Sequence, residues 1–92
     1  MATAAPTHFD VDPSLIGELD LGEFAVPLVD LSDEPLVHTH LRVGDTEYVY
    51  QRSYPIKGHS AVMPEYVAEL LQAGRKALVV ERDERYYVYA TT

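Results

Sequence analysis

The 92-residue chain contains no cysteine, and its first 41 residues contain neither lysine nor arginine. Without cysteine, the chain cannot form a disulfide, a thiolate metal site or a cysteine nucleophile. No apolar stretch approaches the roughly 18 residues that a membrane-spanning helix requires. The amino terminus also lacks a basic region followed by an apolar run, so we expect no signal peptide. These absences favour a cytoplasmic protein.

The small number of basic residues restricts the partners that the chain can bind. After residue 41, seven lysines and arginines are matched by seven acids, and the formal net charge of the whole chain is −8. Binding to nucleic acids depends on basic side chains that displace counterions from phosphates, and anionic membranes attract the same side chains. We therefore expect no direct nucleic-acid partner and no membrane partner.

The acidic residues are concentrated at the front of the chain. Eight of the 15 carboxylates lie within the first 41 residues, so the negative net charge belongs to this part. Asp12-Pro13, Gly17 and Gly22 interrupt any long helix here. The pattern predicts two parts, an acidic and poorly structured arm over residues 1–22 and a single small α+β domain over residues 23–92.

Two segments with alternating apolar residues surround Gly44-Asp45. They predict strands over residues 37–43 and 46–54, joined by a two-residue turn in which glycine supplies the positive φ. The register pairs Val43 with Thr46, and it sorts apolar and polar side chains onto opposite faces.

The carboxyl-terminal part predicts a helix followed by a second hairpin. Pro64 suits the first position of a helix that runs to about residue 73, and Gly74 suits the left-handed residue that ends it. Strands over residues 77–82 and 85–90 then surround a turn at Asp83-Glu84.

Together these elements predict an α+β fold class, ββαββ, in which a small antiparallel sheet of two hairpins has one helix between them. Residues 23–31 could add an extra N-terminal edge strand, because the missing N–H of Pro27 is tolerated at a sheet edge.

Two histidines suggest an alternative function. His38 and His40 are spaced by two residues on a predicted strand, so both imidazoles point to one face, and the hairpin register adds Glu47 to that face. Zinc and iron bind such groups. In the alternative function, these three residues are the site of a small metal-binding or hydrolytic module. A zinc site normally needs three or four protein ligands, however, and a solvated strand face with two ordinary histidines explains the same pattern. We therefore expect no bound metal or other cofactor.

The chain carries no motif that predicts catalysis. Lys57, His59 and Ser60 place a base and a hydroxyl on one loop, but acyl transfer also needs oxyanion donors, and no GxSxG elbow is present. We expect no catalytic residues and a protein that is not an enzyme.

The acidic front mixes carboxylates with apolar residues, which is typical of a docking segment. Charge steering and a few apolar anchors would bring it to the basic surface of a protein partner. The favoured function is thus a non-enzymatic protein-interaction module. Its predicted contact residues are Phe9, Asp10, Asp12, Glu18, Asp20, Glu23 and, from the tyrosine-rich sheet, Tyr54.

Two other interpretations of the acidic front stay open. It could imitate the phosphates of a nucleic acid and inhibit a basic protein, or it could act as a solubilising arm that rests on its own domain. The small size of the folding unit and its strand edges also allow a homodimer.

Overall fold

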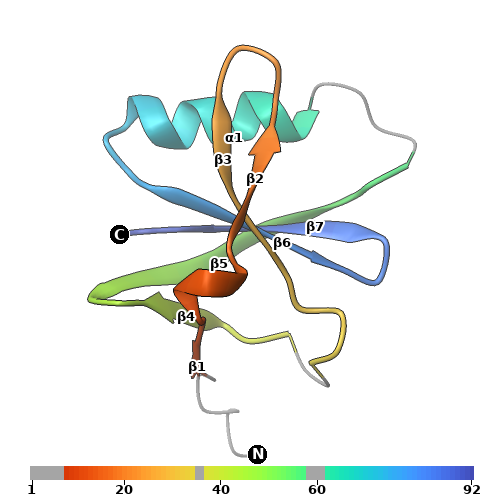
Figure 1. Ribbon diagram of the computed structural model, residues 1–92. Helices are drawn as coiled ribbons and strands as arrows, with labels where there is room; N and C mark the ends of the chain where they lie inside the picture. Colours follow the sequence, from red (N-terminus) through yellow and green to blue (C-terminus); the bar gives the residue numbers. More distant parts are fainter. Residues whose placement is uncertain (1–7, 35–36, 58–61) are drawn as a thin grey trace, which may run out of the picture.

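The computed structural model of the protein describes residues 8–34, 37–57 and 62–92. Seven of its elements are strands that form one mixed sheet, in the order β1-β4-β5-β7-β6-β3-β2 (Figure 1). Along the chain the elements are β1 (His8–Asp10), the 3-10 helix η1 (Pro13–Leu15), β2 (Gly17–Asp20), β3 (Ala25–Asp30), β4 (His40–Val43), β5 (Thr46–Pro55), α1 (Val62–Gln72), β6 (Ala77–Arg82) and β7 (Arg85–Ala90).

The predicted fold class is wrong, because the sheet is neither small nor purely antiparallel. β1 pairs with β4 in parallel, and β3 pairs with β6 in parallel. The other neighbouring strands are antiparallel. Parallel partners must be joined by a long connection, so they lie far apart in the sequence. The local alternation that predicts hairpins carries no information about such pairs.

Both predicted hairpins are present within this larger sheet. β4 and β5 pair with Val43 opposite Thr46, as the turn at Gly44-Asp45 predicts, although β4 begins only at His40. β6 and β7 pair with Arg82 opposite Arg85 around the turn at Asp83-Glu84. Short-range turn signals were therefore sufficient to predict these two registers.

Residues 8–20 form β1, η1 and β2, although the sequence assigned them to a poorly structured arm. β1 and β2 are the two edge strands of the sheet, and residues 11–16 connect them directly. The Val11 N–H donates to the Arg42 carbonyl over 2.8 Å, and the Val11 side chain is only 4% exposed. Apolar side chains between the acids thus bring the front of the chain into the core.

The strand that contains Pro27 is not an edge strand, because β3 lies between β6 and β2. The Leu21 N–H donates to the Phe24 carbonyl at the end of this hairpin. Hydrogen-bonded pairs alternate along antiparallel strands, so the Glu18–Pro27 pair is not hydrogen-bonded. The pairing of β3 with β6 starts at Leu28, one residue later. Pro27 therefore removes no hydrogen bond from either ladder.

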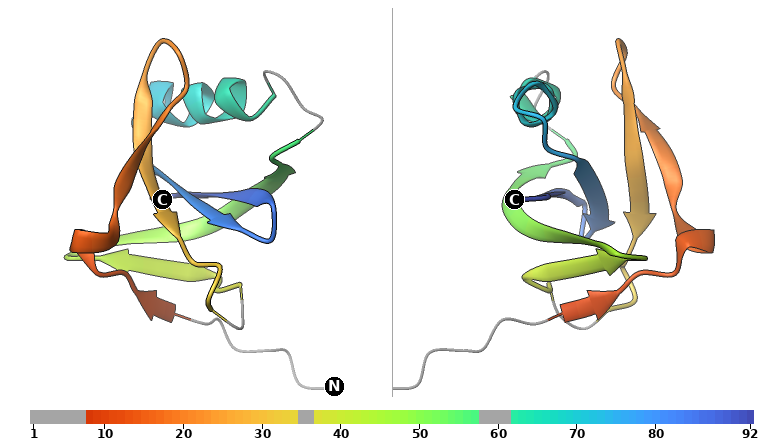
Figure 2. Two further views of the ribbon diagram at one scale, coloured as in Figure 1. Left: turned by 45° about the vertical axis from the view of Figure 1, so that its right-hand side comes forward. Right: turned by 90° about the vertical axis from the view of Figure 1, so that its left-hand side faces the viewer.

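Two core clusters cover the two faces of the sheet, and β6 contributes to both. Leu78 and Val80 belong to the first cluster, whereas Ala77 and Val79 belong to the helix-side cluster. This alternation follows from the pleat, which turns successive side chains to opposite faces. Figure 2 shows α1 at one end of the molecule and the β1–β4 pair at the other, with β5, β6 and β7 between them.

Helix α1 packs through Met63, Val67 and Leu70, which are buried and follow the period of an α-helix. It begins at Val62, two residues before the predicted first position, and it ends where the sequence predicts. Gly74 has a φ of +81°, and the Arg75 N–H donates to the Leu70 carbonyl, as in a Schellman motif. Among the described residues, no helix is long and apolar enough to cross a membrane.

Candidate functional site

A hollow of about 220 Å³ lies between the segment from β1 to η1 and the end of β3. We call it the acidic pocket. Its apolar lining residues are Phe9, Val11, Leu15, Val29 and Leu31, and its acidic lining residues are Asp10, Asp12, Asp30, Asp33 and Glu34. Five of the eight acids from the front of the chain thus converge on one apolar hollow, although they are spread over 25 residues of sequence.

Local hydrogen bonds keep two of these carboxylates charged. The Ser14 backbone N–H and hydroxyl donate to Asp12 over 3.0 and 2.9 Å, and they lower the pKa of Asp12 below its ordinary value. The Ser32 hydroxyl and backbone N–H lower the pKa of Asp30 in the same way, and the backbone bond measures 2.9 Å. A hydrogen bond to the ionised form of an acid favours that form. Asp12 and Asp30 therefore stay ionised to a lower pH than an ordinary aspartate.

His38 supports the pocket from the side. Its ring stacks on Phe9, with ring centroids 5.0 Å apart, and its Nε2 lies 3.3 Å from a carboxylate oxygen of Glu34. Its backbone carbonyl accepts a 2.6 Å hydrogen bond from the Tyr89 hydroxyl. His38 thus connects an apolar and an acidic lining residue of the pocket to the core.

The basic residue Arg82 contacts the segment that follows β3, next to the acidic pocket. Its guanidinium donates to the backbone carbonyls of Leu31 and Glu34, and its Nε lies 3.1 Å from an Asp83 carboxylate oxygen. Arg82 is not among the lining residues, which include no lysine or arginine. Its guanidinium instead stabilises the segment after β3 through these backbone hydrogen bonds.

The predicted contact residues do not form one surface. Phe9, Asp10 and Asp12 line the acidic pocket. Glu18 and Asp20 are exposed on the edge strand β2, and Glu23 lies in the turn that follows it. Tyr54 packs against the helix-side cluster, and its ring lies 6.3 Å from the Tyr66 ring between centroids. The pocket is the place where predicted contact residues converge.

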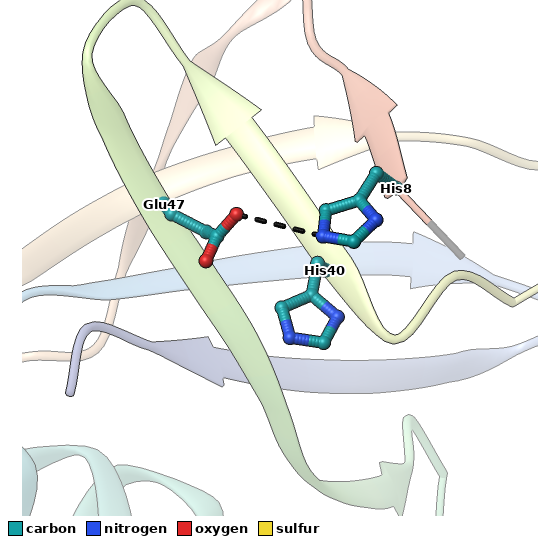
Figure 3. A group of neighbouring side chains, drawn as sticks. All are labelled: His8, His40 and Glu47. Carbon is teal, nitrogen blue, oxygen red and sulfur yellow. Dashed lines mark ion pairs between the residues drawn. The ribbon is translucent and has the colours of Figure 1, made fainter. Parts of the chain in front are cut away.

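A second group of polar side chains lies on β1, β4 and β5 (Figure 3). We call His8, His40 and Glu47 the histidine cluster. One potential ligand atom from each residue lies within 4.8 Å of the other two. The His8 and His40 rings stack with centroids 4.5 Å apart, and His8 Nε2 lies 3.6 Å from Glu47 Oε2. Two imidazoles and a carboxylate are a donor set that transition metals use.

The predicted trio of His38, His40 and Glu47 is only partly correct. His40 and Glu47 are neighbours, but His38 lies outside β4 and packs on Phe9 beside the acidic pocket. His8 takes its place because β1 pairs with β4 in register, with His8 opposite His40. The two paired segments resemble each other in sequence, although such a resemblance does not by itself predict that they pair. HFDV at residues 8–11 and HLRV at residues 40–43 share one pattern of histidine, apolar, charged and valine.

The predicted loop of Lys57, His59 and Ser60 can be placed only at its start. Lys57 is exposed and lines a different hollow with Glu81 and Glu84, whereas His59 and Ser60 lie outside the described residues.

Comparisons of this chain with protein-family models, with curated proteins and with solved structures gave no match. Any functional conclusion therefore depends on the geometry of these two groups of residues.

Proposed function

We propose that the protein is an interaction module that binds a basic segment of a protein partner, with one lysine or arginine side chain entering the acidic pocket. The observation that carries this proposal is the lining of the pocket, in which five acidic residues accompany five apolar residues. The proposal keeps the docking function that the sequence favours, but it moves the contact from a disordered arm to a folded surface.

The lining suits the chemistry of a long basic side chain. Lysine and arginine have an apolar stem that packs on apolar surface and a charged head that seeks polar groups. Phe9 and Leu15 offer the stem an apolar surface, and the acidic residues offer acceptors to the head. Arginine fits this arrangement better than lysine, because its planar guanidinium makes two parallel hydrogen bonds to one carboxylate.

The affinity should depend on several weak contacts acting together. Asp10, Asp12, Asp30 and Asp33 are all exposed, and one exposed ion pair contributes only about 0–1 kcal/mol. Exposed charges are also screened within about 8 Å at physiological ionic strength. We therefore expect binding that weakens as salt rises and that needs both the carboxylates and the apolar contacts.

A titration followed by NMR tests the proposal without knowledge of the natural partner. The probe is a short peptide with blocked ends and one arginine between valines, added to ¹⁵N-labelled protein. We expect the largest shifts in the backbone amides of residues 9–15 and 29–34. The same peptide with citrulline in place of arginine has nearly the same shape but no charge, and it should cause much smaller shifts.

Two variants with the same change in net charge separate the pocket from the general field. Asp10→Asn with Asp33→Asn removes two carboxylates from the pocket, and we expect it to weaken arginine-peptide binding about tenfold, equivalent to about 1.4 kcal/mol. Glu18→Gln with Glu23→Gln removes two carboxylates from the same base-free segment but outside the pocket. Equal weakening by both variants would contradict a pocket and would indicate a diffuse electrostatic attraction.

A further inference from the structure

We propose that the histidine cluster binds one divalent first-row transition-metal ion of the zinc type, with His8, His40 and Glu47 as its protein ligands. None of these three ligands lines the acidic pocket, and the proposal does not depend on the function proposed for that pocket. The sequence favours an ordinary strand face at His40, but it misses the third ligand that β1 brings.

The three ligand atoms are close to the spacing that a shared ion requires. Imidazole nitrogens and carboxylate oxygens bind zinc at about 2.0–2.2 Å, so two ligands of one ion are at most about 4.4 Å apart. The corresponding atoms here lie within 4.8 Å of one another. The His8 and His40 rings would leave their stacked arrangement and turn about their side-chain torsions to direct a nitrogen at the ion. Exposed and half-buried side chains such as these have room for that movement.

The sheet holds the three ligands on neighbouring strands. His8 and His40 are opposite each other in the parallel pair β1–β4, and Glu47 lies on β5, the other neighbour of β4. All three side chains lie on the same side of these strands (Figure 3). Backbone hydrogen bonding therefore fixes the spacing of the ligands before any ion binds, which lowers the cost of assembling the site.

A neighbouring hydroxyl favours one ligand nitrogen of His40. Thr39 Oγ1 lies 2.8 Å from His40 Nδ1. When the hydroxyl accepts a hydrogen bond from Nδ1–H, the neutral ring presents the lone pair of Nε2 to an ion. Metal-binding histidines commonly have their second nitrogen bonded in this way.

Arg42 forms an ion pair with Glu47 and would therefore compete with a metal ion for that carboxylate. Its Nη2 lies 3.8 Å from Glu47 Oε2, and both side chains are about half exposed. Asp10 lies opposite Arg42 in the β1–β4 register and therefore offers the guanidinium a second carboxylate nearby. An ion at the histidine cluster would shift Arg42 from Glu47 toward Asp10. Replacing Arg42 should consequently strengthen metal binding.

Three protein ligands leave one position of a tetrahedral ion open. Zinc sites with two histidines and one glutamate typically hold water or a donor atom of another molecule in the fourth position. The His8 and Glu47 side chains are 56% and 43% exposed, so the open position here faces solvent. Such a site can accept a small anion or a side chain from a bound partner.

Titration of the untagged protein with Co²⁺ tests the site, because the visible absorption of cobalt reports the number and type of its ligands. We expect one equivalent per chain and displacement of Co²⁺ by Zn²⁺. His8→Gln, His40→Gln and Glu47→Gln should each weaken Co²⁺ affinity by at least about 100-fold, because even outer partners of a metal site contribute about 10–100-fold. Arg42→Ala should strengthen it. Zn²⁺ should also raise the thermal midpoint of the wild type, since an ion that binds only the folded state stabilises that state.

The matched control is the double variant His38→Gln with His59→Gln, which retains only the two histidines of the cluster among the four in the chain. It should keep one equivalent of Co²⁺. Loss of binding in this control, or unchanged binding in His8→Gln, would overturn the proposal. Half an equivalent per chain with a doubled mass in light scattering would also overturn it, because the ion would then bridge two molecules.

Discussion

Residues 8–34 and residues 37–92 differ in how their charged groups are satisfied. In the second region, arginines pair with nearby acids, as in Arg42 with Glu47 and Arg82 with Asp83. In the first region, three aspartates instead accept hydrogen bonds from the N–H two residues later: Asp12 from Ser14, Asp20 from Gly22 and Asp30 from Ser32.

This difference explains how an acidic segment without bases can still fold. A hydrogen bond from a backbone N–H to an aspartate two residues earlier stabilises a turn, and it needs no positively charged partner. The negative charge then stays at the surface, because Asp12, Asp20 and Asp30 are all exposed. A one-sided charge pattern therefore does not by itself indicate an unfolded arm.

Deletion of residues 1–22 is the most severe test of this comparison. The deletion removes β1, η1 and β2 and uncovers the first core cluster, in which Val11 is buried and Phe9 and Ile16 pack. We expect the shortened chain to lose cooperative thermal unfolding in circular dichroism. Deletion of residues 1–7, which removes none of the described residues, serves as the control and should unfold like the wild type. If residues 23–92 alone unfold cooperatively at the wild-type temperature, they form an independent domain, and the front is an arm after all.

A single substitution in the front region should have the next largest effect. Val11 is 4% exposed, and Val11→Ala should lower the free energy of unfolding by about 1–3 kcal/mol, because it removes buried apolar surface and leaves a cavity. Leu15 is 65% exposed, so Leu15→Ala should change the free energy of unfolding by less than about 0.5 kcal/mol. Urea unfolding measures both values. Similar small effects at the two positions would mean that the front region does not pack on the core.

A substitution in the turn between β6 and β7 of the second region should stabilise the protein, by less than Val11→Ala destabilises it. Asp83 and Glu84 have φ values of 53° and 59°, which a two-residue hairpin turn needs but which side chains disfavour. Glu84→Gly should raise the free energy of unfolding by about 0.5–1 kcal/mol, because glycine adopts this conformation without the penalty. Glu84→Ala, which removes the same charge but keeps a Cβ, should give no such gain. A destabilised Glu84→Gly protein would show that the turn differs from this description.

The smallest effect concerns the serine that supports Asp12. The lowered pKa means that the Ser14–Asp12 interaction stabilises the fold at pH values above the ordinary pKa of aspartate, about 4. This contribution is lost as the pH falls through the lowered pKa of the folded state. Ser14→Ala removes the hydroxyl donor but not the backbone donor, so the pKa of Asp12 should rise part of the way toward its ordinary value. Titration of the carboxyl carbon by NMR measures this, with Asp30 as the unchanged reference; an unaltered Asp12 would exclude the hydroxyl as a cause.

The sequence predicts those features that depend on neighbouring residues. The turn at Gly44-Asp45 and the helix end at Gly74 follow from residues that adopt a positive φ, and both are confirmed. The partners of β1 and β3 do not follow, because a parallel pair leaves no turn signal in the sequence. Pro27 led to the wrong prediction of an edge strand. A missing N–H excludes proline from an inner strand only where that N–H would have donated a hydrogen bond to the neighbouring strand.

The candidate sites follow the same rule. His40 and Glu47 belong to one hairpin, so the sequence places them together correctly. His8 and the acidic pocket depend on long-range contacts, since β1 pairs with β4 and residues 9–15 line one hollow with residues 29–34. His38 was assigned to a strand face because the apolar pattern suggests a strand from Val37, whereas β4 begins three residues later, at His40.

We propose that the acidic pocket, and not the acidic charge as such, selects the partner. Affinity capture from the native lysate tests it most directly, with three baits compared by quantitative mass spectrometry: the wild type, Asp10→Asn with Asp33→Asn, and Glu18→Gln with Glu23→Gln. We predict at least one basic protein that the wild type and the second variant retain equally, that the pocket variant loses, and that the blocked arginine peptide displaces. Equal retention of every captured protein by all three baits would contradict the claim.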